Sequence, residues 1–456
     1  MKKPRFHEIF SDNMVLQANQ DIAIFGECDD QDEIYVSFGQ NRQKATIENG
    51  TFRAIFPGQS YGTGHNVVLS SKESELALQN VAVGEVWLAG GQSNMEYPLS
   101  QSISGRLEAA LCDGDIRYLT VREDGIQSWK PVDEESCHLS AVGYYFAKIL
   151  ERKLSVPIGI IHVNKGATSV FHWISEERCL SDDVLKPYVL TNLAEYKDVS
   201  EPFTPCWMGA SYEAKYGHFF ETCISKLKSM KIRGVIWYQG ESDAAGEESA
   251  QLYKRGFQLL CEEWRAHFDA PHLPFITTTI ANYSGDWIGG KSSKAWAYMR
   301  EAQAWIGEHF ESVYCINGTD CGNEYNIHPI EKETIGKRMA ACALAEVYGH
   351  PVPYKSPRFQ RAVLKQNEVT VCFTDTYSEI MIANGELHGF CVKDGYRVWH
   401  EVNGRASGDT IILDVTGIYK PQYIKYAFTN GCDLRVYNKY GNPLFAFGKR
   451  PITKDE

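Results

Sequence analysis

The spacing of hydrophobic residues changes twice along the chain. In the first eighty residues, short alternating runs are separated by Gly, Asn and Asp clusters, which is typical of a small antiparallel β domain. The strands expected there are Asp21–Glu27, Glu33–Phe38, Thr51–Pro57 and Asn66–Ser70. Short strand-like runs return from about residue 356. We therefore expect an N-terminal β domain over 1–80, a central domain over 81–350 and a C-terminal β-rich domain over 351–456.

The central region alternates between continuous apolar runs and amphipathic segments. Its five strand candidates are Val83–Gly90, Val156–Asn164, Ile232–Gln239, Leu273–Ala281 and Ser312–Ile316. Near-continuous apolar strands separated by helices are typical of a parallel sheet that is covered on both faces. The pattern therefore predicts an α/β fold for this region.

The helices between these strands are indicated by apolar residues three and four positions apart. Such spacing occurs over 142–150, behind Ser140 as a capping residue, and again over 219–227 and 253–264. A last helix is expected after the fifth strand, with Pro329 in its first turn and Gly349 at its end.

Composition narrows the classes of function. The 456 residues carry a formal net charge of −12, which repels nucleic acid and anionic membrane surfaces. No apolar run reaches the length that spans a bilayer. We therefore expect neither nucleic acid nor a membrane as a partner, and the composition leaves homo-oligomerisation open.

The cysteines and the first residues bear on the compartment. Thirteen cysteines, an odd number without a Cys-x-x-Cys pair, favour reduced thiols over a disulfide framework or a zinc site. The start, MKKPRFHEIFSDNMVLQ, is basic but lacks the apolar stretch of a signal peptide. Together these features predict a cytoplasmic protein.

Candidate chemistry lies where the strands of the central region end. Ligands of doubly wound sheets bind beyond the carboxyl ends of the strands, which all meet at one edge. The first strand is followed by Gly-Gly-Gln and Ser93, the second by a loop with Gly166, and the third by Gln239 and Glu241. The loop after the fifth strand leads to His328. We expect these residues to converge.

This set of groups suits ester hydrolysis. A serine hydroxyl becomes an effective nucleophile when a base removes its proton, and His328 can take that proton and return it to the departing alcohol. The backbone N–H of Ser93, the N–H near Gly166 and the side-chain amide of Gln239 are suitable oxyanion donors. Each such donor contributes about 3–4 kcal/mol in the transition state.

The same residues have ordinary structural explanations. Two glycines before Ser93 also make a simple turn, and the loop residues after the second and third strands also permit tight turns or cap helices. His162 and His172 lie near the same edge and compete with His328 for the role of base. The pattern by itself leaves these alternatives open.

Longer motifs carry a resemblance. The stretches VGEVWLAGGQSNMEYPL, SAVGYYFAKILERKLSVPIGIIHVNKGATSVFHW, IRGVIWYQGESDA and NIHPIEKETIGKRMA resemble the sialate O-acetylesterase family, a branch of the SGNH hydrolases. The likeness extends into both β regions and covers nearly the whole chain. GQSNM and WYQGES at this separation are specific signals.

The resemblance implies a flavodoxin-like three-layer catalytic domain, flanked by β-rich domains, that removes O-acetyl groups from sugars without a metal or another cofactor. It implies Ser93 as the nucleophile, through an acetyl-serine intermediate, and His328 as the base. It also places Ser93, Gly166 and Gln239 in the oxyanion hole. Other residues of the same motifs are expected near the substrate, namely Gln92, Asn94 and Glu241.

Two positions depart from the family pattern. Ala167 stands where relatives often have glycine, and Asn326 stands where many relatives have the aspartate that orients the imidazole. An amide cannot balance an imidazolium charge, and the same Asp-to-Asn change lowers kcat of a serine protease by about 10⁴. Either Asn326 or a nearby carboxylate (Glu324, Asp320 or Asp243) serves as orienter, or the enzyme works as a Ser-His dyad with a backbone carbonyl.

The substrate implied by the resemblance is an acetylated sialic acid or an acetylated oligosaccharide derived from xylan or mannan. The segment 179–217 is expected to form a variable lid. Asn326 also motivates an alternative function, a catalytically weakened or inactive sugar-binding protein of the same fold.

Overall fold

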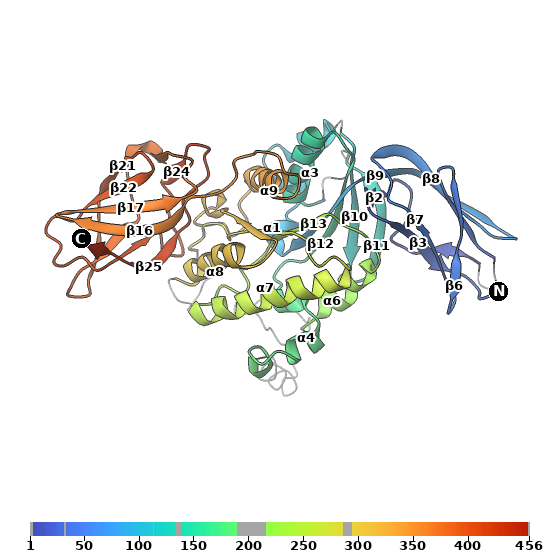
Figure 1. Ribbon diagram of the computed structural model, residues 1–456, viewed down its shortest axis with the longest axis horizontal. Helices are drawn as coiled ribbons and strands as arrows, with labels where there is room; N and C mark the ends of the chain where they lie inside the picture. The colour runs from blue at the N-terminus through green and yellow to red at the C-terminus, as the bar shows by residue number, and fades with distance from the viewer. Residues whose placement is uncertain are drawn as a thin grey trace.

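The computed structural model describes residues 3–31, 33–112, 114–133, 136, 138–188, 216–285 and 294–454. Figure 1 shows an elongated molecule with a mixed α/β region between two β regions, and the chain ends lie in the outer two. The expected lid falls largely on 189–215, outside the described residues. Among the described helices, none combines the length and the apolar character needed to cross a bilayer.

The strands of the N-terminal region pair antiparallel, as predicted, except for β2, which pairs in parallel with β9. One sheet has the order β1-β3-β7-β6, and β4, β5 and β8 pair alongside the start of β9. Its strands are β1 (Arg5–Phe6), β2 (Val15–Gln17), β3 (Ile22–Glu27), β4 (Tyr35–Phe38), β5 (Asn41–Lys44), β6 (Thr46–Glu48), β7 (Thr51–Phe56) and β8 (Gly62–Ser70). All four predicted strands are present.

The expected boundary at residue 80 falls inside one long strand, β9 (Glu75–Gly91). The first half of β9 pairs with β8, whereas its second half pairs with β12 and β13 of the central sheet. Its residues change from mostly exposed to fully buried at Val81. The N-terminal and central regions are therefore joined through a shared strand.

The central sheet is parallel in the order β10-β12-β9-β13-β14-β15, with β11 antiparallel at one edge. Its members after β9 are β10 (Ile116–Arg122), β11 (Gly125–Pro131), β12 (Ile158–Asn164), β13 (Gly234–Tyr238), β14 (Phe275–Thr278) and β15 (Val313–Ile316). The five predicted strands take the order 2-1-3-4-5, which makes the first strand the switch point of the sheet. Strands β10 and β11 were not predicted. In β10 the buried, charged Arg117, which pairs with Asp115, interrupts the apolar pattern, and β11 has a single buried residue.

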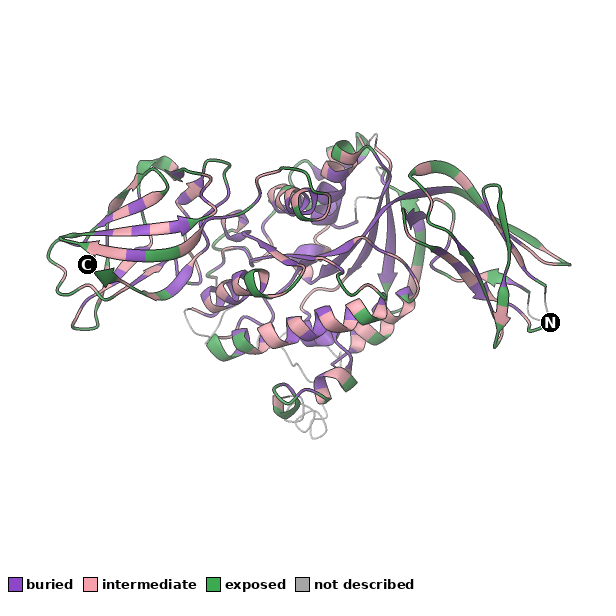
Figure 2. Ribbon diagram, in the orientation of Figure 1, coloured by how far each residue is buried: buried purple, intermediate pink, exposed green. Residues whose placement is uncertain are grey.

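Helices cover both faces of this sheet, as Figure 1 shows. Helices α3 (Ala141–Leu154) and α9 (Glu333–Glu346) share a core with Trp87 and Ala89 of β9. Helices α7 (Glu247–His267) and α8 (Ala295–His309) contribute to the core that contains the alternate β9 residues. Figure 2 shows the buried strands between these layers. The prediction of a sheet buried on both faces is confirmed.

Of two helices expected around the sheet, one begins as predicted and the other is interrupted. Ser140 caps α3 as predicted, since its side chain accepts from the Gly143 N–H. The helix expected over 219–227 breaks at Cys223 into α6 (His218–Thr222) and a 3₁₀ turn, Ile224–Leu227.

Buried polar groups explain why α8 and α9 differ from the helices that the apolar spacing predicts. Helix α9 begins four residues after Pro329, because the chain there is held by the Lys332 ammonium, which donates to the Pro329 carbonyl at 2.6 Å. Helix α8 was not predicted, since its buried face includes Arg300 and Gln303 and thus lacks a clean apolar stripe.

The C-terminal region has its own core between two sheets, ordered β21-β22-β17-β16-β26 and β20-β19-β23-β25. A short pair, β18 and β24, lies beside them. The strands are β16 (Arg358–Lys365), β17 (Glu368–Thr374), β18 (Ile380–Ile382), β19 (Phe390–Lys393), β20 (Trp399–Glu401), β21 (Gly404–Ser407), β22 (Thr410–Asp414), β23 (Tyr423–Tyr426), β24 (Val436–Asn438), β25 (Phe447–Pro451) and β26 (Thr453–Lys454).

Candidate active site

Ser93 is the first residue of the short helix α1 (Ser93–Glu96), directly beyond the carboxyl end of β9. The exit from the strand requires glycine at position 91, where φ is +137° and an added Cβ would lie 2.1 Å from the Tyr238 carbonyl oxygen. The backbone N–H of a first helical residue has no acceptor within its own helix. The turn therefore presents both the hydroxyl and the amide of Ser93 at the switch point of the sheet.

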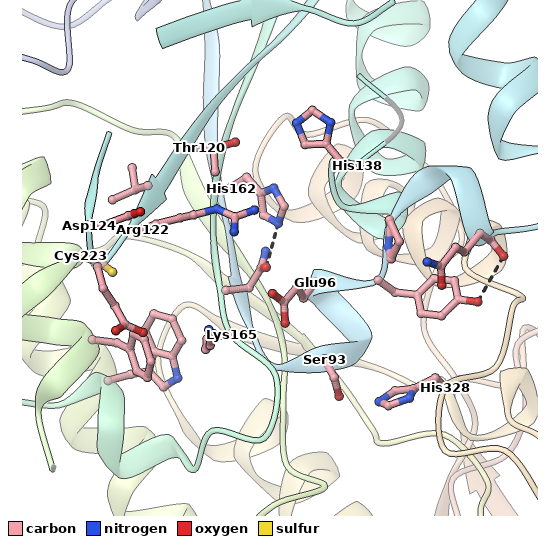
Figure 3. Close-up of a pocket in the computed structure, with 18 residues that line it drawn as sticks. Ser93, Glu96, Thr120, Arg122, Asp124, His138, His162, Lys165, Cys223 and His328 are labelled. Carbon is pink, nitrogen blue, oxygen red and sulfur yellow. Dashed lines mark hydrogen bonds between the residues drawn. The ribbon is translucent and has the colours of Figure 1, made fainter. Parts of the chain in front are cut away.

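A cavity of about 620 Å³ opens at this edge, a size typical of small-molecule sites. Ser93 and His328 both line it. Figure 3 shows the side chain of His328 beside that of Ser93 in this cavity. The structure thus brings together the two residues that the sequence proposed as nucleophile and base.

The surroundings of His162 and His172 distinguish them from His328 as candidates for the base. His172 is fully buried, does not line the cavity, and accepts from the Ser169 N–H through Nδ1 at 3.0 Å. His162 does line the cavity, on β12. In Figure 3, His328 and not His162 lies beside Ser93.

His328 is held in the form that accepts protons. Burial and the nearby charge of Lys332 lower its pKa below the ordinary value of 6.5. An imidazole with a lowered pKa is neutral at neutral pH, and the neutral ring is the one that can act as a general base.

None of the four residues expected to orient the imidazole hydrogen-bonds the ring among the contacts of the described residues. Asp243 accepts from the Val170 N–H at 3.0 Å and from the side-chain amide of Gln239 at 2.6 Å. Asn326 accepts from the backbone N–H of the histidine at 3.0 Å, so it shapes the loop instead. Glu324 accepts from the Ser284 hydroxyl at 2.9 Å, and Asp320 forms an ion pair with Arg338 at 2.6 Å. Each group is satisfied elsewhere, so the geometry does not support them as ring partners.

A buried network that the sequence did not indicate connects the nucleophile turn with the histidine loop. The side-chain NH₂ of Asn94 donates to Glu241 Oε1 at 2.6 Å and to the Ile327 carbonyl at 3.1 Å. The Lys332 ammonium donates to Asn94 Oδ1 at 2.7 Å and to the Pro329 carbonyl at 2.6 Å. The carbonyls of the residues before and after His328 are therefore held in place by hydrogen bonds, one from Asn94 and one from Lys332, which itself binds Asn94.

The two ionisable groups of this network are nearly inaccessible to solvent. Burial raises the pKa of Glu241 and lowers the pKa of Lys332 to about 7. The only sequence signal for Lys332 was its position four residues after the candidate base. Neither Asn94 nor Glu241 lines the cavity, so their side chains support the site from behind rather than contact its contents.

Gln92 and Gln239 also lie behind the cavity wall. The NH₂ group of Gln239 donates to Gln92 Oε1 at 3.2 Å, to the Thr168 carbonyl at 2.9 Å and to Asp243 Oδ2 at 2.6 Å. Gln239 is fully buried and does not line the cavity. The amide expected to face the oxyanion instead connects three loops, and Gln92, which was expected near the substrate, does not line the cavity.

Gly166 lies against the nucleophile, as expected, but its N–H already has an acceptor. A Cβ at this position would lie 3.4 Å from Ser93 Cβ, which shows how closely the two backbones approach. The Gly166 N–H donates to Glu96 Oε2 at 2.6 Å. Ala167, the first departure from the family pattern, has a φ of +61°, a left-handed conformation in which glycine is favoured.

Lys332→Met is expected to move the acidic limb of the kcat/KM profile to higher pH. Lys332 is charged below about pH 7, and this charge lowers the pKa of His328. Without it, the histidine becomes protonated, and thus inactive as a base, at a higher pH. The profile is measured with a chromogenic acetate ester. Lys337→Met, at an exposed site of α9, is the control, and an identical acidic limb in both variants would contradict the prediction.

In the described ranges, no group of three or more His, Cys, Asp and Glu side chains is arranged to hold a metal ion. The cysteines that the structure describes are all free thiols.

Comparison with known proteins identifies the class of this chain as carboxylic ester hydrolase. The sequence profile of the family described as carbohydrate esterase, sialic acid-specific acetylesterase, matches residues 83–345, and the chain belongs to this family. The match runs from within β9 through β15 and includes both Ser93 and His328.

Individual relatives agree with this assignment. A sialate O-acetylesterase of Rattus norvegicus is 26% identical over 428 residues, which cover 82% of this chain and 78% of the relative. The Homo sapiens sialate O-acetylesterase is 26% identical over 328 residues, or 64% of this chain and 59% of that protein. The crystal structure of a carbohydrate acetylesterase from Xanthomonas citri has a TM-score of 0.85 at 26% identity and covers 98% of this chain and 99% of its own.

Proposed function

We propose that the protein is a carbohydrate O-acetylesterase that works through Ser93 and His328 by way of an acetyl-serine intermediate. The observation that supports this proposal is that the hydroxyl and a neutral imidazole line one cavity at the switch point of the sheet. A parallel sheet brings the strand ends to one edge, but proton transfer further requires that the Ser93 hydroxyl and the His328 imidazole lie next to each other.

The reaction proceeds in two stages. His328 takes the Ser93 proton as Oγ attacks the acetyl carbonyl, and it then gives that proton to the departing sugar oxygen, which leaves acetyl-serine. A water molecule then loses a proton to His328 and attacks the acetyl carbon, and the imidazolium returns its proton to Oγ as acetate leaves.

The imidazole is oriented in this proposal by its anchored loop and not by a carboxylate. Asn94 and Lys332 bind the carbonyls of Ile327 and Pro329, on either side of the base. Fixing the backbone on both sides restricts the ring, so a Ser-His dyad is sufficient for proton transfer.

The oxyanion is stabilised by two backbone amides that flank the nucleophile, those of Ser93 and Gly166. In the free protein the carboxylate of Glu96 accepts the hydrogen bond of the Gly166 N–H, and Glu96 also lines the cavity. The substrate carbonyl oxygen therefore has to replace this carboxylate. The product acetate is itself a carboxylate, so Glu96 also competes with it and favours its release.

Glu96→Gln is expected to make acetate a stronger product inhibitor. A neutral amide accepts a weaker hydrogen bond from Gly166 and does not repel the acetate anion, and the loss of that repulsion lowers the inhibition constant for acetate by about tenfold. The constant is measured from initial rates at increasing acetate concentration. Glu123→Gln, at another carboxylate of the same cavity, is the control. Equal inhibition of the wild type and Glu96→Gln would contradict the role given to Glu96.

The substrate class is tested by acetate release from acetylated N-acetylneuraminic acid, acetylated xylobiose and acetylated mannobiose, together with 4-nitrophenyl esters of increasing acyl length. We expect release from at least one sugar and a rate that falls as the acyl chain lengthens. Activity on none of the acetylated sugars would contradict the proposal, and sugar binding without turnover would instead favour the alternative of an inactive sugar-binding protein.

A further inference from the structure

A second group of polar side chains lines the same cavity, on the carboxyl ends of β10 and β12. Thr120 and His162 are neighbours in the register of these two parallel strands, and both are almost completely buried. Both line the cavity that contains Ser93. Figure 3 shows His162 with the guanidinium of Arg122 beside it, at a distance from the nucleophile.

Two buried atoms of this group have no hydrogen-bond partner among the described residues, namely Thr120 Oγ1 and His162 Nδ1. Folded proteins rarely leave such atoms unpaired, because burial removes their bonds to water without replacing them. Two of them in the wall of one cavity indicate that a polar group of a ligand completes them.

The hydrogen bonds of Asn164 determine what His162 can offer. The Asn164 NH₂ group donates to the Ala89 carbonyl at 3.3 Å, so its Oδ1 is the atom that contacts His162 Nε2 at 2.8 Å. Nε2 therefore carries the hydrogen and donates. Burial lowers the pKa of His162 to about 4, so the ring is neutral and Nδ1 presents an acceptor lone pair.

The chemistry of the missing group follows from these partners. His162 Nδ1 requires a donor, whereas the guanidinium of Arg122 only donates and requires an acceptor. The hydroxyl of Thr120 can do either. A sugar hydroxyl both donates and accepts, whereas a carboxylate cannot donate to Nδ1.

We propose that Thr120, His162 and Arg122 form a subsite that binds a hydroxyl group of the sugar while the acetyl ester lies at Ser93. This inference rests on the proposed function and extends it, because it assigns the recognition of the sugar to residues that take no part in the chemistry. The acetyl group and the sugar are then bound by separate parts of one cavity.

The experiment compares two substrates in each variant. Thr120→Val keeps the shape of the side chain and removes its hydroxyl, and His162→Phe keeps a ring and removes the acceptor. For the acetylated sugar that the wild type hydrolyses fastest, kcat/KM is expected to fall at least about fivefold more than for 4-nitrophenyl acetate, which has no sugar hydroxyl. Equal losses on both substrates, or no loss on the sugar, would overturn the subsite.

Thr277→Val is the matched control. Thr277 on β14 also has a buried hydroxyl without a partner in the described structure, but it does not line the cavity. We expect this variant to match the wild type on both substrates. The melting temperature of Thr120→Val is expected not to fall, because the threonine hydroxyl has no partner among the described residues. A large fall would instead indicate a structural role and count against the subsite.

A binding measurement separates this inference from the proposed function. The deacetylated sugars corresponding to the acetylated panel are titrated calorimetrically into the wild type and into Thr120→Val. A dissociation constant at least about threefold weaker in the variant supports the subsite even if no ester is hydrolysed. Equal constants, or no binding of any sugar to the wild type, would overturn it, whatever the esterase assays show.

Discussion

Ser93→Ala is expected to lower kcat for 4-nitrophenyl acetate by about 10⁴-fold or more. Loss of the nucleophile removes the acyl-enzyme route, and only the catalysis supplied by binding and oxyanion donors is left. Initial rates give the size of the effect. Mass spectrometry of the acetylated wild-type protein, mapped to peptides, tests whether Ser93 carries the acetyl group.

The control for this variant is Ser242→Ala. Ser242 is a buried serine at the carboxyl end of β13, and it does not line the cavity. It is expected to retain activity within about twofold of the wild type, since its hydroxyl neither lines the cavity nor has a hydrogen-bond partner among the described residues. If Ser93→Ala were folded and retained more than a tenth of the wild-type rate, Ser93 would not be the nucleophile.

Asn94→Ala is expected to combine the largest loss of stability with a loss of activity. The substitution leaves Glu241 Oε1 and the Ile327 carbonyl without their donor, and it removes one acceptor of the Lys332 ammonium. Unsatisfied buried groups cost about 1–3 kcal/mol each, so the free energy of unfolding should fall by about 3 kcal/mol. Chemical denaturation measures this loss, and kcat is expected to fall as the histidine loop loses its anchor.

Asn326→Ala tests the opposing explanation. Asn326 is exposed, and among the described residues its side chain hydrogen-bonds the backbone N–H of His328 alone, so we expect a loss of kcat below about tenfold and a small change in stability. A greater loss of kcat in Asn326→Ala than in Asn94→Ala would show that the side chain at position 326 orients the base.

Much of the fold followed from local patterns. The apolar runs predicted the five central strands, and Ser140 marked the start of α3, because burial on both faces and helix capping each leave a signature within a few residues. Two of the segments that were missed, β10 and α8, contain buried charge. Arg117 in β10 and Arg300 in α8 interrupt the apolar pattern, and each is accommodated by acceptors that the sequence pattern does not reveal, an aspartate and backbone oxygens for Arg117 and backbone carbonyls for Arg300.

The chain by itself determined where the candidate chemistry lies: the glycine turn and the strand ends place Ser93 and the histidine loop at one edge of the sheet, since parallel strands all end on the same side. Only the tertiary structure decided which groups surround the pair. Glu96 on Gly166, the Asn94–Lys332–Glu241 network and the unpaired atoms of Thr120 and His162 depend on contacts between segments distant in sequence. Hydrogen bonds require the atoms to meet within about 3 Å, and spacing along the chain does not specify such distances between separate elements.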